Sequence, residues 1–200
     1  MTYSDFTLEQ VRTAFALHLR QAALFPQVAA VAVPDWLPAT LERGRPFALT
    51  SEKARSELIV VPILLASMER SAAPRSLYSG QRLDVAPEHG LNGECDFLLS
   101  NQPALPILQA PMLTIVQAKE NDIEGELGQC AAQMVGARRF NEREGSDIRT
   151  IFGCVTSGES WQFLRLEADT LVLDTERYYR VNLGLLLGVF AAIDAYYLPA

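Results

Sequence analysis

Hydrophobic residues follow two different periods along the chain, and the change between them predicts the order of its elements. Before residue 76, apolar side chains recur at the three- and four-residue spacing of amphipathic helices. Thr50 or Ser51 can cap the last of these helices, and Pro62 should kink it. The prolines between residues 25 and 46 predict irregular chain around a short helix. The predicted helices are residues 7–24, 36–43 and 51–70.

From residue 76 onward the pattern favours strands, with one long helix between them and another at the end of the chain. The strand at residues 112–119 begins with five almost wholly apolar residues, so it should be buried on both faces of a sheet. The helix after it leads to another strand, which implies a parallel pair with a right-handed crossover. The predicted strands are residues 76–85, 93–100, 112–119, 149–156, 161–166 and 170–173, and the helices are residues 124–141 and 183–198.

This order of elements predicts one mixed-sheet α/β domain. No change of composition marks a linker, so residues 1–48 are expected to form a helical extension packed on the domain of residues 49–200. The apolar stretch at residues 183–198 contains Asp194 and is shorter than the roughly 20 residues that span a bilayer. It is therefore expected to be a buried helix, and no membrane partner is expected.

Charge and cysteine content exclude several classes of protein. The chain has 24 acidic and 17 basic residues, a net charge of −7, which argues against a general binder of nucleic acids or membrane surfaces. Its three cysteines are far apart and its two histidines fit no metal-binding spacing, so we expect free, buried thiols and no zinc site. Together with the lack of a signal-peptide pattern, this favours a cytoplasmic protein.

Candidate chemistry gathers on two successive predicted strands. Asp96 lies in the first strand, and Gln117 and Lys119 lie two residues apart at the end of the second, on one face. If the strands are neighbours, these side chains converge, and Glu57 on the preceding helix can reach the same point. Phosphodiester hydrolysis with Mg²⁺ needs oxygen ligands on neighbouring elements and a nearby lysine. Only two of the 17 basic residues are lysines, which sets Lys119 apart.

Asp96 with Gln117-Ala118-Lys119 resembles the paired half-motifs of the PD-(D/E)xK, or restriction-endonuclease-like, nuclease superfamily. The resemblance covers about residues 50–190, and the segment Leu91-Asn92-Gly93-Glu94-Cys95-Asp96-Phe97 looks like a bacterial branch of that superfamily. It implies a restriction-endonuclease-like core, which is a helix, a three-stranded meander, a crossover helix and a further strand, here followed by a C-terminal hairpin and helix. It also implies a Mg²⁺-dependent DNA endonuclease that uses one or two Mg²⁺ or Mn²⁺ ions.

The resemblance also implies a role for each residue that matches a motif position. Its metal ligands would come from two acidic side chains and one backbone carbonyl, and its catalytic cation would be a lysine. These roles are metal binding for Asp96, Glu57 and the carbonyl of Ala118, catalysis for Lys119, Gln117 and Asp96, and support from the crossover helix for Gln129.

The chain departs from the motif at two positions. Cys95 stands where the motif usually has proline, and Gln117 stands where it usually has an acid. Because a neutral amide is a weaker Mg²⁺ ligand than a carboxylate, the alternative is a catalytically inactive nuclease-fold module that binds protein or nucleic acid, or dimerises. Glu94 and Glu120 are nearby carboxylates, and both are expected to point to the opposite face unless the strand has ended or bulged there.

Several other residues have a structural and a functional interpretation. Arg138 and Arg139 belong to the densest basic cluster, which is either a nucleic-acid contact or a solvated helix end. Glu57 can also pair with Lys53 one helical turn before it. The last helix and the hairpin of Trp161 are candidate surfaces for a homodimer.

Overall fold

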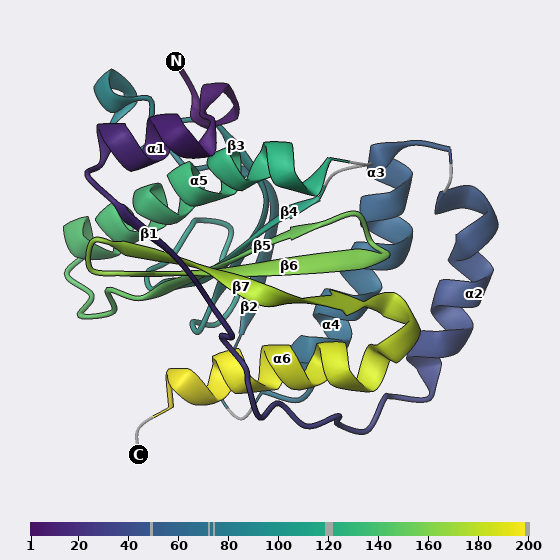
Figure 1. Cartoon of the computed structure of the whole chain (residues 1–200). Helices are drawn as coiled ribbons and strands as arrows, with labels where there is room; N and C mark the ends of the chain where they lie inside the picture. Colours follow the sequence, from purple (N-terminus) through teal and green to yellow (C-terminus); the bar gives the residue numbers. More distant parts are fainter. Residues whose placement is uncertain (49, 72, 74, 119–121, 199–200) are drawn as a thin grey trace.

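Figure 1 shows the computed structural model of the chain, which describes residues 1–48, 50–71, 73, 75–118 and 122–198. Within these residues seven strands form one mixed sheet in the order β1-β7-β6-β5-β4-β3-β2, which confirms the predicted α/β class. The strands are β1 (His18–Ala22), β2 (Ser76–Arg82), β3 (Glu94–Ser100), β4 (Met112–Ala118), β5 (Ile151–Thr156), β6 (Ser160–Glu167) and β7 (Thr170–Tyr179). The helices are α1 (Leu8–Ala14), α2 (Trp36–Ala48), α3 (Glu52–Arg55), α4 (Val61–Met68), α5 (Ile123–Arg143) and α6 (Leu183–Tyr196), with a π-helical turn at Ser56–Val60 and 3-10 turns at Tyr3–Asp5, Pro87–His89 and Arg180–Asn182.

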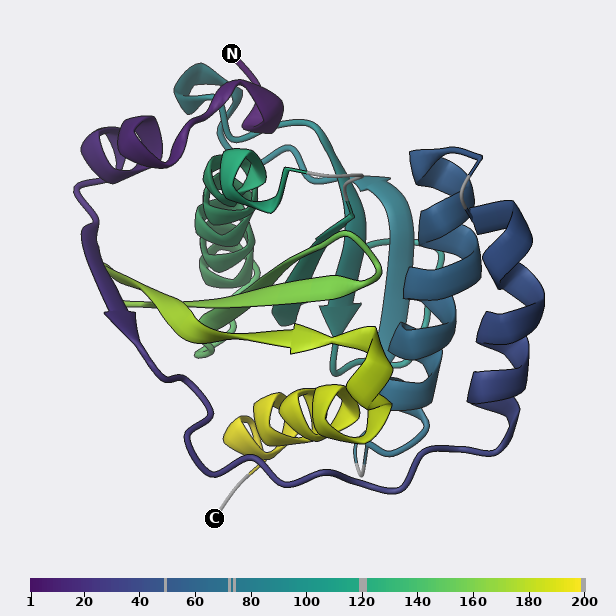
Figure 2. The same cartoon turned by 45° about the vertical axis from the view of Figure 1, so that its right-hand side comes forward.

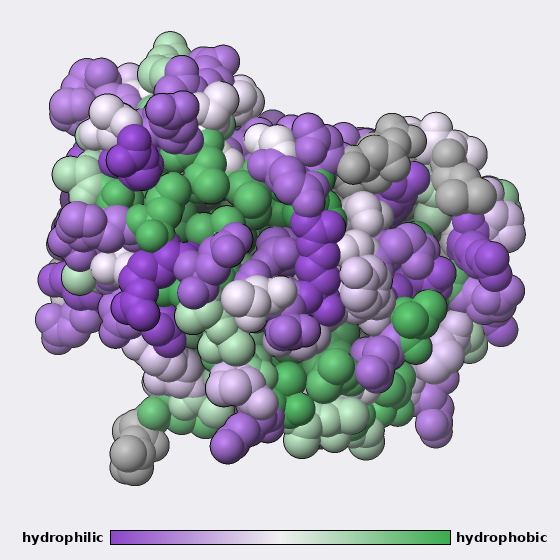
Figure 3. All heavy atoms as spheres, viewed as in Figure 1, coloured by the Kyte–Doolittle hydropathy of each residue, from purple (hydrophilic) through white to green (hydrophobic). Residues whose placement is uncertain are grey.

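Helices cover both faces of the sheet, and each face has its own apolar core (Figure 2). α5 lies over one face with α1 outside it, while α4 and α6 lie over the other with α2 outside α4. Ile115 and Leu164 are buried under α5, and Trp161 and Phe163 are buried on the side of α4 and α6. Figure 3 shows hydrophilic residues over most of one face of the molecule, with apolar atoms between α1 and β1 and along α6.

β4 is the fully buried central strand that the sequence predicts. It pairs in antiparallel fashion with β3 and in parallel with β5, and α5 is the predicted crossover between the parallel strands. The buried side chain of Asn141 ties the end of α5 to the start of β4, because its Nδ2 donates to the Met112 carbonyl (2.8 Å) and its Oδ1 accepts the Met112 N–H (2.7 Å). This two-bond contact fixes the helix along the strand.

α6 confirms the predicted buried helix at the C-terminal end. Asn182 precedes it and accepts the backbone N–H of Leu185 (3.4 Å). The ring of Phe190 packs edge-on against Trp161, which has no exposed surface (5.9 Å between centroids). Trp161 is therefore a core residue, and a homodimer surface on its hairpin or on α6 stays a prediction. No helix among the described residues is long and apolar enough to cross a bilayer.

The helix predicted at residues 7–24 is wrong beyond Ala14. Ala16 has a φ of +51°, which interrupts the helix, and the chain continues as β1, parallel to β7. Phe15, Leu17 and Leu19 alternate with other residues, so the apolar period here is that of a strand. Pairing with a strand far along the chain supplies hydrogen bonds that no local pattern reveals.

The helix predicted at residues 51–70 is divided by a wider turn. Ser51 caps it as predicted, accepting the Ala54 N–H (3.0 Å). The irregularity expected at Pro62 takes the form of the π-helical turn just before it, in which the Val61 N–H bonds to the Ser56 carbonyl. The proline ring crowds the carbonyl four residues back, and a widened turn relieves this crowding.

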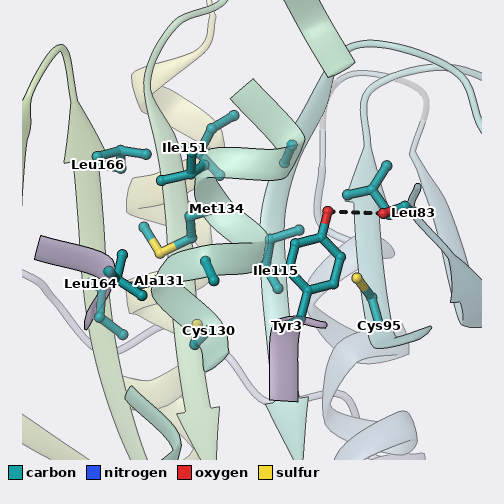
Figure 4. Packing of buried hydrophobic residues seen from close by; sticks show 14 of the residues in the cluster. Tyr3, Leu83, Cys95, Ile115, Cys130, Ala131, Met134, Ile151, Leu164 and Leu166 are labelled. Atoms are coloured by element: carbon teal, nitrogen blue, oxygen red, sulfur yellow. Dashed lines mark hydrogen bonds between the residues drawn. The ribbon is translucent and has the colours of Figure 1, made fainter. Parts of the chain in front are cut away.

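Tyr3 anchors the N-terminal segment under α5 (Figure 4). Its side chain is 1% exposed, and its hydroxyl donates to the Leu83 carbonyl across the core (2.8 Å). A Cβ on Gly136 of α5 would come within 2.2 Å of that hydroxyl, so the helix needs glycine for this close approach. Burial raises the pKa of Tyr3, which keeps the hydroxyl a donor at all ordinary pH values.

Replacing Tyr3 by phenylalanine is expected to lower the free energy of unfolding by about 1–3 kcal/mol, because the Leu83 carbonyl is left buried without its donor. Denaturant unfolding checks this. The same change at Tyr179, which is 52% exposed, should alter the free energy by less than about 0.5 kcal/mol. Equal effects at the two positions would contradict the anchoring role.

Asp174 fixes the chain that leaves β1. Its carboxylate is buried and accepts the N–H groups of Leu24 (3.1 Å) and Glu176 (3.2 Å) and the hydroxyl of Tyr178 (3.4 Å). Burial nevertheless outweighs these bonds and raises the pKa of Asp174 above its ordinary value of 3.8. The charged carboxylate is thus a destabilising group in the folded state.

The Asp174→Asn variant keeps the acceptor oxygen and removes the buried charge, so its melting temperature should exceed that of the wild type at pH 7. The advantage should be full above the raised pKa and should vanish as the pH falls below 3.8, where Asp174 is protonated in both states. Thermal unfolding between pH 3 and pH 7 checks this. Asp169→Asn, at a side chain 65% exposed, serves as the control and should give no gain.

Candidate active site

Asp96 and Gln117 meet at the end of the sheet where β4 finishes. Phe97 of β3 pairs with Val116 of β4, and extending this register by one residue puts Asp96 directly opposite Gln117. The Gln117 Nε2 donates to Asp96 Oδ2 (2.6 Å), and the backbone N–H of Ala118 donates to the same oxygen (2.8 Å). The expected convergence therefore occurs for Asp96 and Gln117, and the carboxylate is held by two N–H groups.

α5 supplies a second layer of polar groups behind this pair. Its N-terminus is capped by Asp122, which accepts the Gly125 N–H (2.9 Å). One face of the helix then directs two amides at the sheet, as their four-residue spacing predicts. Gln129 Nε2 donates to Gln117 Oε1 (3.1 Å), and Gln133 Nε2 donates to the Glu94 carbonyl (3.3 Å). The helix is thus bonded to both strands, at the start of β3 and at the end of β4.

A pocket of about 430 Å³ opens beside Asp96, between the sheet edge and the helices α3 and α4. Carboxylates outnumber basic groups among its described lining residues, so the pocket is negatively charged and favours cations. Its charged lining residues within the described part of the chain are Glu52, Lys53, Glu57, Glu94 and Asp96.

Glu57 lies near Lys53, as one interpretation of the sequence predicts, and it also lies near Asp96. It stands in the π-helical turn and lines the same pocket as Asp96. Its side chain is 61% exposed, and its Oε1 lies 4.0 Å from Lys53 Nζ, the partner expected one turn earlier. π-helical turns are frequent at functional sites, so the metal-binding role of Glu57 stays a prediction with a suitable location.

The expectation for Glu94 is wrong, because its side chain lines the pocket together with Asp96. The two residues are two apart in β3, so strand geometry puts them on the same face, and this spacing was the signal available in the sequence.

Gly80 on β2 faces Asp96 across the strands, between the pairs Ser79–Phe97 and Gln81–Cys95. Its φ of +62° and the 3.3 Å from a built Cβ to Glu94 Oε1 explain the glycine.

Two of the residues singled out in the sequence lie outside the described residues. These are Lys119, the expected catalytic lysine, and Glu120. Ala118 is described, and it is the last residue of β4, where it pairs with Thr156 of β5. The metal-binding role of its carbonyl stays a prediction.

The cysteines near the site are free and buried, as predicted. Cys95, Cys130 and Cys154 are all free and buried. Burial, and then the carboxylate of Asp96, raise the pKa of the Cys95 thiol, so it remains protonated at neutral pH. Within the described residues, no group of three or more histidine, cysteine, aspartate or glutamate side chains is placed to hold a metal ion. Any cation here needs amide, backbone or water oxygens as well.

Arg138 and Arg139 lie on α5, the helix of Gln129, and well away from Asp96. The rise of the helix puts them about 14 Å along its axis from Gln129. Arg138 donates to the Ala168 carbonyl in the β6–β7 turn, and burial lowers its pKa. Arg139 lies over the ring of Phe15, 5.4 Å from its centroid. Both side chains hold neighbouring elements, and their contact with nucleic acid stays a prediction.

No protein-family model, curated protein or solved structure matches this chain. A carboxylate and an amide meet on adjacent strands, a second amide supports them from α5, and an acidic pocket lies in front.

Gly80→Ala is expected to cost about 1–2 kcal/mol of stability, the strain of a left-handed backbone with a Cβ, and also to displace the Glu94 side chain. Gly145→Ala is the matched control, since Gly145 has a φ of +76° and a Cβ there would meet nothing within 4 Å. Both variants should unfold more easily, but only Gly80→Ala should shift the ¹³C signal of the Glu94 carboxyl group. A shift of that signal in both variants would show that strain alone moves the pocket.

Proposed function

We propose that this chain is a Mg²⁺-dependent DNA endonuclease with a restriction-endonuclease-like core. The supporting order of elements is α3 and α4, the meander β2–β3–β4, the crossover helix α5 and the strand β5. The observation that carries the proposal is the bond from Gln117 to Asp96, a residue that lines the same pocket as Glu57. In this proposal β1, β6, β7 and α6 extend the core and do not supply ligands.

The donor set near Asp96 suits a hard divalent cation. A carboxylate, an amide oxygen and a backbone carbonyl are the oxygen ligands that Mg²⁺ and Mn²⁺ accept, and Mg²⁺ often binds few protein groups and keeps several waters. Asp96, Gln117 Oε1 and the carbonyl of Ala118 would hold the ion, and Glu57 could assist it or a second ion. A bound ion would polarise the phosphate and lower the pKa of a water molecule.

The other proposed roles follow from charge. Lys119 would stabilise the negative charge that develops on the phosphate and orient the attacking water. The acidic pocket repels a DNA backbone until a divalent cation reverses the local sign. Non-specific affinity for DNA should therefore be weak, even with Arg138 and Arg139 as auxiliary phosphate contacts.

One observation favours the second candidate, a catalytically inactive nuclease-fold module that binds protein or nucleic acid. Gln117 turns its Nε2, rather than its oxygen, toward Asp96, so this arrangement presents one ligand fewer to a cation. Calorimetry separates the two candidates. Heat of binding with Mg²⁺ or Mn²⁺ at millimolar concentration supports the endonuclease, and its absence supports the inactive module.

Nicking of supercoiled plasmid DNA in Mg²⁺ or Mn²⁺ tests the endonuclease directly. Asp96→Asn and Lys119→Ala should each lower the rate by about 100-fold or more, since each removes charge stabilisation at the reacting phosphate. Asp147→Asn, at an exposed residue beyond the end of α5, should cleave at the wild-type rate. Circular dichroism shows whether the variants are folded. Full metal-dependent cleavage by both site variants would contradict the proposal.

A further inference from the structure

The polar side chains at the end of β4 form a chain of hydrogen bonds that point in one direction. Gln129 donates its Nε2 hydrogen to Gln117 Oε1 (3.1 Å), and Gln117 donates its Nε2 hydrogen to Asp96 Oδ2 (2.6 Å). The donor order runs from α5 through β4 to β3. The last bond therefore puts an N–H against the carboxylate at which a cation is proposed to bind.

Two amides in series can reverse this direction while the backbone stays in place. A half-turn about the last side-chain bond of glutamine exchanges its carbonyl oxygen with its NH₂ group. If Gln117 turned alone, its NH₂ group would face the NH₂ group of Gln129, and two donors would oppose each other. If Gln129 turns as well, Gln117 donates to Gln129 Oε1, and the bond between them is regained.

The reversed arrangement leaves two acceptors facing each other at the Asp96 end of this chain of hydrogen bonds. Gln117 Oε1 would lie against Asp96 Oδ2, where the donor now stands 2.6 Å away. Two oxygens in such a position repel each other unless a cation lies between them. The resting direction is therefore favoured without a cation, and the reversed direction is favoured with one.

We propose that Gln117 and Gln129 form an amide relay whose direction is coupled to divalent-cation binding at Asp96. The inference rests on the proposed function of this site and adds its regulation. Gln117 is 1% exposed, so neither of its amide atoms can find water as a substitute partner, and the two amides turn together. The cation is bound only by the reversed state.

Gln129 is then a positioning residue. It determines which atom of Gln117 faces Asp96 and never contacts the cation itself. Because the binding-competent direction is a minor population at rest, the affinity for a cation is lower than the same ligands would give if they were already turned. A residue at position 129 that can only accept a hydrogen bond removes the resting direction.

Calorimetric titration with Mn²⁺ alone tests the relay through Gln129→Glu. The new carboxylate can bond only to the Nε2 of Gln117, which directs Oε1 to Asp96, so affinity should rise about 10-fold, the effect of one hydrogen bond. Added negative charge also raises affinity. The same change is therefore made in the Gln117→Met background, where no amide can turn and the gain should be at most about 3-fold. Equal gains in both backgrounds would overturn the relay, because charge alone would explain them.

A second measurement uses the wild-type chain. The bond to the Asp96 carboxylate should move one side-chain amide proton of Gln117 downfield, and saturation with Mg²⁺ should abolish that shift. A shift that persists at saturating Mg²⁺, in protein that still nicks DNA, would disprove the relay and leave the proposed function intact. No binding of Mg²⁺ or Mn²⁺ at millimolar concentration to either the wild type or Gln129→Glu would overturn both.

Discussion

The position of α5 along β4 determines almost everything at the candidate active site. Asn141 engages both backbone groups of Met112 at one end, and Gln129 reaches Gln117 at the other. The rise of an α-helix gives about 18 Å between Gln129 and Asn141, and the rise of a strand gives about 17 Å between Met112 and Gln117. Because these lengths agree, one straight helix satisfies both contacts. A shift of the helix by one residue would break at least one of them.

The sequence predicts those elements whose own residues specify them. β4 is apolar throughout and lies in the centre of the sheet, and α5 has the spacing of a helix and the place of a crossover. β1 could not be predicted, because Leu17 and Leu19 alternate over too few residues to outweigh the helical pattern before them. Its partner strand, β7, is also distant in the sequence. An irregularity near Pro62 was correctly predicted, but its form, a π-helical turn, was not, because a proline is compatible with a bent helix as well as with a widened turn.

The candidate site also has features that the sequence predicts and features that it does not. Which residues meet follows from strand register, so the meeting of Asp96 and Gln117 could be predicted from their positions. The direction of the bond between them could not, because a glutamine offers a donor and an acceptor of similar shape and its neighbours decide which is used. The acidity of the pocket could not be predicted from the sequence either. It comes from Glu52 and Glu57 on one segment and Glu94 and Asp96 on another, which composition counts as part of a dispersed net charge of −7.

The parallel pairing of β1 with β7 has a consequence for how the chain assembles. His18 pairs with Thr170, so about 150 residues of chain separate the two strands in the order of synthesis. During translation the N-terminal strand has no partner until the last hairpin has emerged and paired with β5. Such a long-range contact forms slowly, so β1 joins the edge of the sheet beside β7 late in folding. Until then β7 presents an open edge, to which the first strand of a second nascent chain can bind as well as its own.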